Sequence, residues 1–239
     1  MSIKTVLFDL DGTLLPMDLD EFIQAYFKKI TQWLVPYGYE PKELVDTIWC
    51  GTLAMMKNDG LQTNETVFWK VMEEKYGSEM RYDHNTFDRF YDKEFDKLSD
   101  ICGFQPLAAD IVHSLQQKGY QIILATNPIF PQAATHWRIR WAGLKPEDFC
   151  YITTYENASY SKPNLDYYRS ILEMHHLKPE ECLMVGNDAT EDMVAQELGM
   201  EVFLLTECLL NKHKKDIQQY PNGDFYKLKQ YIDQLPVLT

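Results

Sequence analysis

Two aspartates spaced two residues apart follow a short apolar run near the start of the chain, in the segment VLFDLDGTLL at residues 6–15. The apolar run predicts a buried strand over residues 5–8. In an extended chain residues i and i+2 point to the same side, so Asp9 and Asp11 are expected to converge. Converging carboxylates repel each other and need a cation, a shared proton or hydrogen bonds to hold them together. The rest of the chain therefore has to supply such partners.

Short apolar runs recur along the chain and alternate with helical patterns in its second half. The strands predicted from these runs cover residues 5–8, 121–125, 150–153, 182–185 and 202–205. Helices are predicted at residues 107–118, 131–142, 164–175, 189–198 and 221–235. Repeated strand–helix units with continuous apolar strands are typical of a doubly wound α/β fold with a parallel sheet.

Residues 17–103 break this rhythm, because they contain no convincing strand. Helical periodicity is present instead at residues 19–33, 41–56, 65–76 and 87–98. We therefore expect an α/β core formed by residues 1–16 and 104–239, and an inserted helical domain formed by residues 17–103. Such an insert would lie over the carboxyl ends of the strands, where open α/β sheets bind their ligands.

The charge balance limits the classes of partner. The 23 basic and 36 acidic residues give a formal net charge of −13, which argues against binding to nucleic acid or to an anionic membrane. An anionic substrate would need locally placed cations. No apolar run approaches membrane-spanning length and residues 1–4 lead directly into a strand, so the cytoplasm is the expected location. The five cysteines show no CxxC spacing and are expected to be mostly buried thiols.

Polar residues follow several of the predicted strands at their carboxyl ends. Because these ends share one edge of a parallel sheet, residues distant in sequence can meet there. The residues at this edge are Asp9, Asp11, Thr126, Asn127, Lys162, Gly186, Asn187, Asp188 and Asp192.

Four motifs follow one another along the chain: the sequence DxDGT, a strand that ends in Thr, a Lys-Pro pair, and an acidic loop that follows a Gly. In this order they resemble the motifs of the haloacid dehalogenase-like hydrolase superfamily, and the resemblance covers nearly the whole chain. The helical insert is similar to the α-helical cap of many members. The resemblance implies a phosphate-transfer enzyme that uses Mg²⁺ and an aspartyl-phosphate intermediate.

The chemistry of the individual residues supports the same assignment. A carboxylate attacks phosphorus when a metal neutralises the charges, and Asp9 is expected to be this nucleophile. Asp11 is placed to act as the general acid and base. Thr126, Asn127 and Lys162 are expected to bind the phosphoryl group, and Lys162 supplies fixed positive charge.

The acidic loop departs from the common family pattern of Gly-Asp, because Asn187 directly follows Gly186. The expected Mg²⁺ ligands are Asp9, Asp11 and this loop, in which either the amide oxygen of Asn187 or the carboxylate of Asp188 faces the ion. Asp192 is better placed to brace the loop or Lys162 than to touch the metal.

Other interpretations have different signatures. An EF-hand loop would need more oxygen ligands and a terminal Glu, whereas Leu14 and Leu15 follow here. Dehalogenases of the superfamily lack the second aspartate, so Asp11 favours phosphoester chemistry. A phosphomutase of the same superfamily and a non-catalytic binding or regulatory protein with the same fold are the alternatives.

The expected partner is a small phosphorylated metabolite, and its identity depends on the helical insert. Phe22 and Tyr26, on the first helix of the insert, are the aromatic residues expected to face the cleft. The sequence does not indicate an oligomeric state.

Overall fold

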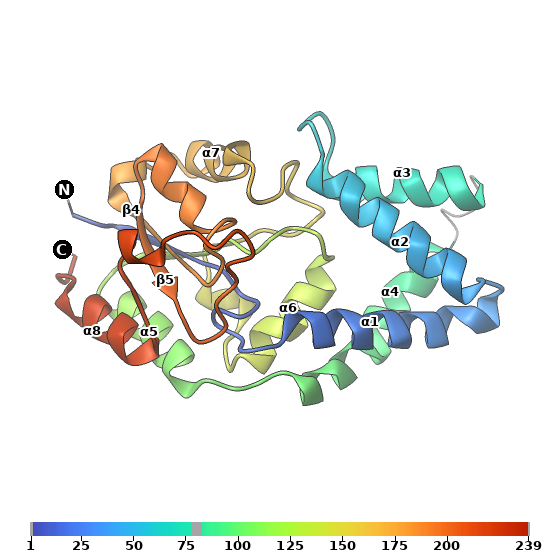
Figure 1. Ribbon diagram of the computed structural model, residues 1–239, viewed down its shortest axis with the longest axis horizontal. Coiled ribbons are helices and arrows are strands. Elements are labelled where there is room, and N and C mark those ends of the chain that lie inside the picture. The colour runs from blue at the N-terminus through green and yellow to red at the C-terminus, as the bar shows by residue number, and fades with distance from the viewer. Residues whose placement is uncertain (1, 78–82, 239) are drawn as a thin grey trace.

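A parallel sheet forms the centre of the protein, as predicted, and among the described residues it has a sixth strand in addition to the five predicted ones. The computed structural model describes residues 2–77 and 83–238, and within these ranges the sheet has the order β3-β2-β1-β4-β5-β6 (Figure 1). Its strands are β1 (Thr5–Phe8), β2 (Gln121–Leu124), β3 (Tyr151–Ile152), β4 (Cys182–Gly186), β5 (Glu201–Leu205) and β6 (Asn222–Gly223). The chain fills one half of the sheet from β1 to β3 and the other half from β4 to β6. The order therefore reverses between β1 and β4, where doubly wound sheets form their binding crevice.

The strands are apolar on both faces because helices cover both sides. Val6 and Phe8 of β1 belong to one buried cluster, whereas Leu7 points into the other. In Figure 1, α5 and α8 lie below the sheet and α7 lies above it. The helices of this part are α5 (Pro106–Gln117), α6 (Gln132–Trp141), α7 (Leu165–Met174) and α8 (Phe225–Gln234). Short 3₁₀ helices occupy Pro146–Asp148, Pro179–Glu181, Met193–Leu198 and Ile217–Gln219.

The segment between β1 and α5 is helical, and its helices lie to one side of the sheet (Figure 1). They are α1 (Leu19–Leu34), α2 (Pro41–Met56), α3 (Asn64–Tyr76) and α4 (His84–Lys93), with 3₁₀ helices at Val35–Tyr37 and Phe95–Ile101. We call this segment the cap. The two chain segments that connect it to the sheet pair with each other, because Met17 bridges Cys102 and the Gly103 N–H donates to the Pro16 carbonyl at 2.7 Å. This pairing supports our proposed division of the chain at residues 16/17 and 103/104.

The turn between α2 and α3 attaches the cap to the loops around the carboxyl edge of the sheet. Asn64, fully buried at the start of α3, donates its side-chain N–H groups to the Pro128 carbonyl at 3.0 Å and to Ser161 Oγ at 3.2 Å. The Asn64 N–H donates to the Ala158 carbonyl at 2.8 Å. One cap residue therefore joins the loop after β2 to the loop that precedes α7.

Four local features differ from the sequence-based predictions. The helix predicted over 189–198 is reduced to Met193–Leu198, because hydrogen bonds of the side chains in the preceding loop hold residues 188–192 in a turn. The helix predicted over 87–98 ends at Lys93 and continues as a 3₁₀ helix that buries Phe95. The helix predicted over 221–235 starts at Phe225, because Asn222–Gly223 pair with β5. The prediction of mostly buried thiols was wrong: only Cys182 is buried, whereas Cys50 and Cys150 are exposed.

None of the helices in residues 2–77 and 83–238 combines the length and the apolar character needed to cross a membrane.

The turn that follows β1 depends on Gly12. Its φ angle of +79° lies in the left-handed region, which residues with a side chain rarely adopt. A Cβ atom at this position would also come within 2.3 Å of Asn187 Nδ2, which donates to the Cys208 carbonyl at 2.6 Å. Gly12 thus allows the loop after β1 to lie directly against the loop after β4.

Substitution of Gly12 should therefore cost more than backbone strain alone. Gly38 is a matched control, because its φ is +98° and a Cβ there would meet no atom within 4 Å. We expect Gly38→Ala to lower the free energy of unfolding by about 1–2 kcal/mol. Gly12→Ala should lower it by roughly 1–3 kcal/mol more, because the Asn187 hydrogen bond has to break. Urea denaturation measures both, and equal losses would contradict this account.

Candidate active site

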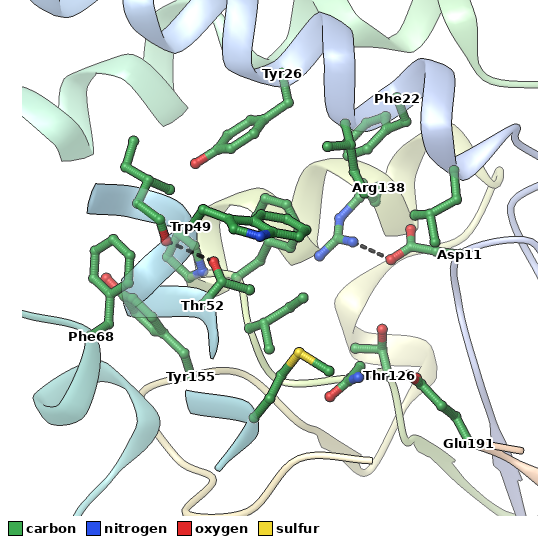
Figure 2. Close-up of a pocket in the computed structure, with 18 of the residues that line it drawn as sticks. Asp11, Phe22, Tyr26, Trp49, Thr52, Phe68, Thr126, Arg138, Tyr155 and Glu191 are labelled. Carbon is green, nitrogen blue, oxygen red and sulfur yellow. Dashed lines mark hydrogen bonds and ion pairs between the residues drawn. The ribbon is translucent and has the colours of Figure 1, made fainter. Parts of the chain in front are cut away.

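The predicted site residues meet at the carboxyl edge of the sheet, where they surround one cavity of about 260 Å³. Figure 2 shows this cavity, with Asp11 and Arg138 facing each other at one end and the hydroxyl of Thr126 pointing into it. The residues predicted at this edge that line the cavity are Asp9, Asp11, Thr126, Asn127, Asn187, Asp188 and Asp192. Lys162 joins them through direct contact with Asp9.

Lys162 is the central cation of the site. Its side chain is 1% exposed, and its ammonium lies 2.9 Å from Asp9 Oδ1 and 2.6 Å from Asp192 Oδ1. Burial opposes the charged form of Lys162, but Asp192 and Asp9 outweigh it and hold the pKa well above its usual range. Lys162 therefore remains positively charged and is one of the partners that the paired aspartates require.

Asp9 has a second partner in the turn that follows it. The hydroxyl of the buried Thr13 lies 3.1 Å from Asp9 Oδ2 and 3.0 Å from Asn187 Oδ1. Both oxygens of the Asp9 carboxylate are thus held in place, one by Lys162 and one by Thr13. A fixed carboxylate at the edge of a cavity is suited to attack a substrate bound there.

Arg138 is the partner of Asp11, and the sequence analysis did not find it. Its guanidinium, 1% exposed, forms an ion pair with Asp11 Oδ2. Arg138 lies on α6 and is fixed there by bonds to the Ala134 carbonyl at 3.3 Å and Thr135 Oγ1 at 3.2 Å. It also lies 4.6 Å from the ring centre of Phe130. An arginine inside a helix carries no motif, so only the three-dimensional arrangement reveals this contact.

The Asp11 carboxyl keeps one oxygen without a partner. Asp11 Oδ1 is buried and has no hydrogen-bond partner among the described residues, while Oδ2 contacts Arg138. Burial raises the pKa of Asp11 to about 6, although Arg138 acts in the opposite direction. A carboxyl group with a pKa near neutrality is able both to donate and to accept a proton.

The two residues after β2 are held by the loops around them. The Thr126 carbonyl accepts hydrogen bonds from the hydroxyls of Thr153 at 2.7 Å and Tyr167 at 2.9 Å, which leaves its side chain directed into the cavity (Figure 2). Asn127 Oδ1 accepts the Lys162 N–H at 3.3 Å, and Asn127 Nδ2 donates to Glu191 Oε2 at 3.0 Å. The segments that carry Thr126, Asn127 and Lys162 are therefore joined.

Glu191 is a further cavity residue that the sequence analysis missed. Its carboxyl lines the cavity beside Asn127, and burial raises its pKa to about 7. Its only sequence signal is its position between Asp188 and Asp192 in the acidic loop.

The two candidate metal ligands in the acidic loop after β4, Asn187 and Asp188, differ in the hydrogen bonds that their side chains make. Both ends of the Asn187 amide are occupied, Oδ1 by Thr13 and Nδ2 by the Cys208 carbonyl. Asp188 Oδ1 accepts the N–H groups of Thr190 at 2.6 Å and Glu191 at 2.9 Å. Among the described residues, no bond uses Asp188 Oδ2, which leaves this oxygen available to a cation.

Asp192 supports both Lys162 and the loop. Its Oδ1 accepts from Lys162, and its Oδ2 accepts the Asp188 N–H at 2.9 Å. Asp192 thus has the bracing position that its spacing indicated. A Cβ at Gly186 would lie 2.1 Å from Asp192 Oδ2, so the absence of a side chain there makes room for this carboxylate.

Comparison with known proteins gives consistent matches over the whole chain. Residues 6–205 match the model of a family described as haloacid dehalogenase-like hydrolase. The pyrophosphatase PpaX of Bacillus cereus (strain G9842) is 26% identical over 239 residues, which cover 100% of this chain and 98% of that protein.

Two solved structures show that the likeness extends to the fold. A predicted phosphoglycolate phosphatase from Haemophilus somnus 129pt has a TM-score of 0.60 at 19% identity, covering 97% of this chain and 98% of the other. The HAD-hydrolase YfnB from Bacillus subtilis, in a structure bound to magnesium, has a TM-score of 0.54 at 19% identity. The match covers 98% of this chain and 100% of the other.

Proposed function

Because this chain is a hydrolase that belongs to the haloacid dehalogenase-like family, we propose that it is a Mg²⁺-dependent phosphatase acting on a small phosphorylated metabolite. The observation that carries the proposal is the fixed Asp9 carboxylate at the cavity, with the partly unpartnered carboxyl of Asp11 close by in sequence. A nucleophile and a separate proton donor are the two groups that phosphoester cleavage needs. A cytoplasmic location is part of the same proposal.

The first half of the reaction transfers the phosphoryl group to Asp9. An Asp9 oxygen bonds to phosphorus while the bond to the ester oxygen breaks, and Asp11 gives its proton to the departing oxygen. Lys162 balances negative charge on Asp9 and on the phosphoryl oxygens, and the Thr126 hydroxyl and Asn127 orient them. The product of this half is an alcohol and an aspartyl phosphate.

The second half regenerates Asp9. Asp11, now ionised, takes a proton from water as the water oxygen bonds to phosphorus, and the bond to the Asp9 oxygen breaks. Inorganic phosphate leaves and Asp11 is again protonated. Arg138 holds the Asp11 carboxyl between these two steps, so we assign it the role of a positioning residue.

The residues of the cavity fit Mg²⁺. Among the described residues its lining includes six acidic side chains and two basic ones, Arg138 and Lys212, so an anionic ester needs an added cation to enter. Mg²⁺ prefers oxygen ligands and is commonly bound through one or two carboxylates together with substrate phosphate. The described residues contain no cluster of three or more His, Cys, Asp or Glu side chains arranged to hold a metal, so in the proposal the substrate phosphate has to complete the ligand set.

In the proposal Asp9 and Asp188 would supply these carboxylates, and Mg²⁺ held there would offset the negative charge of the phosphoryl group. Arg138 holds the Asp11 carboxyl for proton transfer. Both ends of the Asn187 amide are occupied, whereas no bond among the described residues uses Asp188 Oδ2. Of the two loop residues, Asp188 is therefore the expected ligand.

The fate of the phosphoryl group distinguishes the alternatives. A phosphatase releases it as inorganic phosphate, a phosphomutase returns it to a second hydroxyl of its substrate, and a non-catalytic relative transfers none. Phosphate release from 4-nitrophenyl phosphate in the presence of Mg²⁺ tests the proposed class directly.

Asp9→Asn should abolish turnover, because a carboxamide does not compete as a nucleophile at phosphorus. We expect the rate of 4-nitrophenyl phosphate hydrolysis to fall to background while circular dichroism shows an intact fold. EDTA should stop the wild-type reaction, and Mg²⁺ should restore it. Wild-type-like activity of Asp9→Asn, or full activity in a verified metal-free preparation, would refute the mechanism.

Asp11→Asn should impair hydrolysis most for esters with poor leaving groups, since an activated aryl oxide departs without a proton. For the first chemical step, we expect a loss of about 10²–10⁴ in rate with an alkyl phosphate and a much smaller loss with 4-nitrophenyl phosphate. Single-turnover measurements isolate this step. Equal losses with both esters would count against general acid catalysis by Asp11.

Asp188→Ala should raise the Mg²⁺ concentration for half-maximal activity by at least about tenfold, because a carboxylate ligand of the ion is lost. Asp192→Ala is the comparison, since Asp192 contacts Lys162 and the loop. It should lower turnover with a smaller change in the Mg²⁺ requirement. The increase in melting temperature on adding Mg²⁺ provides a readout independent of activity. An unchanged requirement in Asp188→Ala would leave Asn187 and water as the ligands on that side.

A further inference from the structure

The wall of the cavity that the cap provides is almost entirely apolar. Ten of the cavity-lining residues are aromatic, and α1, α2, α3 and α4 all contribute to them. Phe22 and Tyr26, which the sequence placed at the cleft, both line it. In Figure 2, Tyr26, Trp49, Phe68 and Tyr155 lie on the far side of Arg138 from Asp11, and Phe22 lies next to Arg138. Among the described cap residues that line the cavity, Asp88 alone is charged.

Some of the α2 side chains that form this wall are exposed to solvent. Trp49 is 45% exposed and Met56 is 41% exposed, and both line the cavity, while Ile48 and Met55 beside them are buried. Trp49 and Met56 are seven residues apart and therefore share one face of the helix. Apolar side chains that line a concave cavity gain stability when an apolar group removes them from water.

Lys162 and Arg138, two of the three cations that the described residues place near the cavity, are already engaged at the reaction centre. Lys162 contacts Asp9 and Asp192, and the guanidinium of Arg138 pairs with Asp11. Lys212 lies two residues beyond Leu210, which pairs with Asp188 in the acidic loop, so it belongs to the phosphate end. Within the described residues, the cap therefore supplies no positive charge to the cavity.

A second anionic group on the substrate would lack a partner at the cap end. A phosphate or carboxylate placed among these aromatic side chains would lose its hydration without compensation, and Asp88 would repel it. An aromatic ring or an alkyl chain would instead gain from contact with the wall, with ring packing adding to the burial of apolar area.

We propose that the cap selects phosphate monoesters whose leaving alcohol is uncharged and largely apolar, such as an aromatic or medium-chain alkyl alcohol. This inference rests on the proposed phosphatase function and specifies its substrate class. It separates the chain from the activities named for its relatives, because pyrophosphate and phosphoglycolate both carry a second anionic group.

A series of n-alkyl phosphates tests the inference without changing the chemistry of the leaving oxygen. From ethyl to butyl to hexyl phosphate, we expect kcat/KM to rise about fourfold per methylene, which corresponds to about 0.8 kcal/mol of transfer free energy. Pyrophosphate and 2-phosphoglycolate should be poorer substrates than hexyl phosphate. A flat series, or a higher kcat/KM for either substrate with a second anionic group, would overturn the proposal.

Trp49→Ala tests whether the apolar wall of the cap causes the preference for longer alkyl esters. Leu53→Ala is its matched control. Leu53 lies one turn further along α2 with 39% exposure but does not line the cavity. Trp49→Ala should reduce kcat/KM for hexyl phosphate by at least tenfold, mainly through a higher KM. For ethyl phosphate, kcat/KM of this variant should stay within about twofold of the wild-type value. Leu53→Ala should match the wild type for both. Equal effects of the two substitutions would contradict the assignment of this wall.

Thr52→Lys tests the charge argument in the opposite direction. Thr52 lines the cavity between Trp49 and Met56 on α2. A lysine there should raise kcat/KM for 2-phosphoglycolate by at least tenfold and lower that for hexyl phosphate. If neither value changes in a folded variant, the missing cation is not the basis of selection.

Binding of 2-naphthol separates failure of the inference from failure of the proposed function. Titration of the Mg²⁺-containing protein, followed by tryptophan fluorescence, should show saturable binding that weakens at least tenfold in Trp49→Ala and is unchanged in Leu53→Ala. If no phosphate ester is hydrolysed but 2-naphthol binds in this way, the phosphatase proposal fails and the apolar site stands. If ethyl and hexyl phosphates are hydrolysed at equal rates and 2-naphthol does not bind, the apolar site is overturned and the phosphatase proposal stands.

Discussion

The buried contact of Lys162 with Asp9 and Asp192 is the interaction on which the arrangement of the active site depends. A lysine side chain that is 1% exposed is stable only when opposite charges surround its ammonium group. Its partners come from the end of β1 and from the loop after β4, so the three segments must meet for any of these charges to be compensated. Thr13 and Asn187 reinforce the same junction from the other side of Asp9. The charge that organises the site also holds Asp9, the proposed nucleophile, in place.

The sequence predicted the framework better than the contacts within it. Continuous apolar runs locate β1 and β4 because strands covered on both faces must be apolar throughout, and the observed bounds differ from the predicted ones by at most one residue there. Strand β6 was not predicted, because its two residues, Asn222 and Gly223, are too few to show a hydrophobic pattern. They form a strand by pairing with the adjacent β5. The acidic loop also shows the limit of helix propensity as a predictor. Residues 189–192 have a helical pattern, but the Thr190 and Glu191 N–H groups donate to the Asp188 carboxylate and the Ala189 N–H donates to the Leu210 carbonyl.

For the candidate site too, the sequence predicted some residues and missed others. Asp9, Asp11, Thr126, Lys162 and Asp188 could be predicted because each follows an element end whose position the apolar pattern fixes. Arg138 could not, because nothing in the α6 sequence indicates that this side chain turns inward to Asp11. The alternation of a strand predicted that the two aspartates converge, and both line the same cavity, although β1 already ends at Phe8. Each has its own cation, Lys162 for Asp9 and Arg138 for Asp11, and these two ion pairs offset the repulsion between the carboxylates.

The cavity combines two chemically distinct parts that are set by different portions of the chain. The edge of the sheet supplies charged groups that suit transfer of any phosphoryl group, and these are the residues that carry the family resemblance. The cap supplies an aromatic wall that contains none of the groups proposed to react at phosphorus. Asn64 connects the two parts, since it binds the loops next to Asn127 and Lys162 from the start of α3. In the proposed function, a change in how the cap sits on the sheet would therefore reach the loops that carry Asn127 and Lys162. The buried amide of Asn64 would then couple substrate selection by the wall to the positioning of the phosphoryl group.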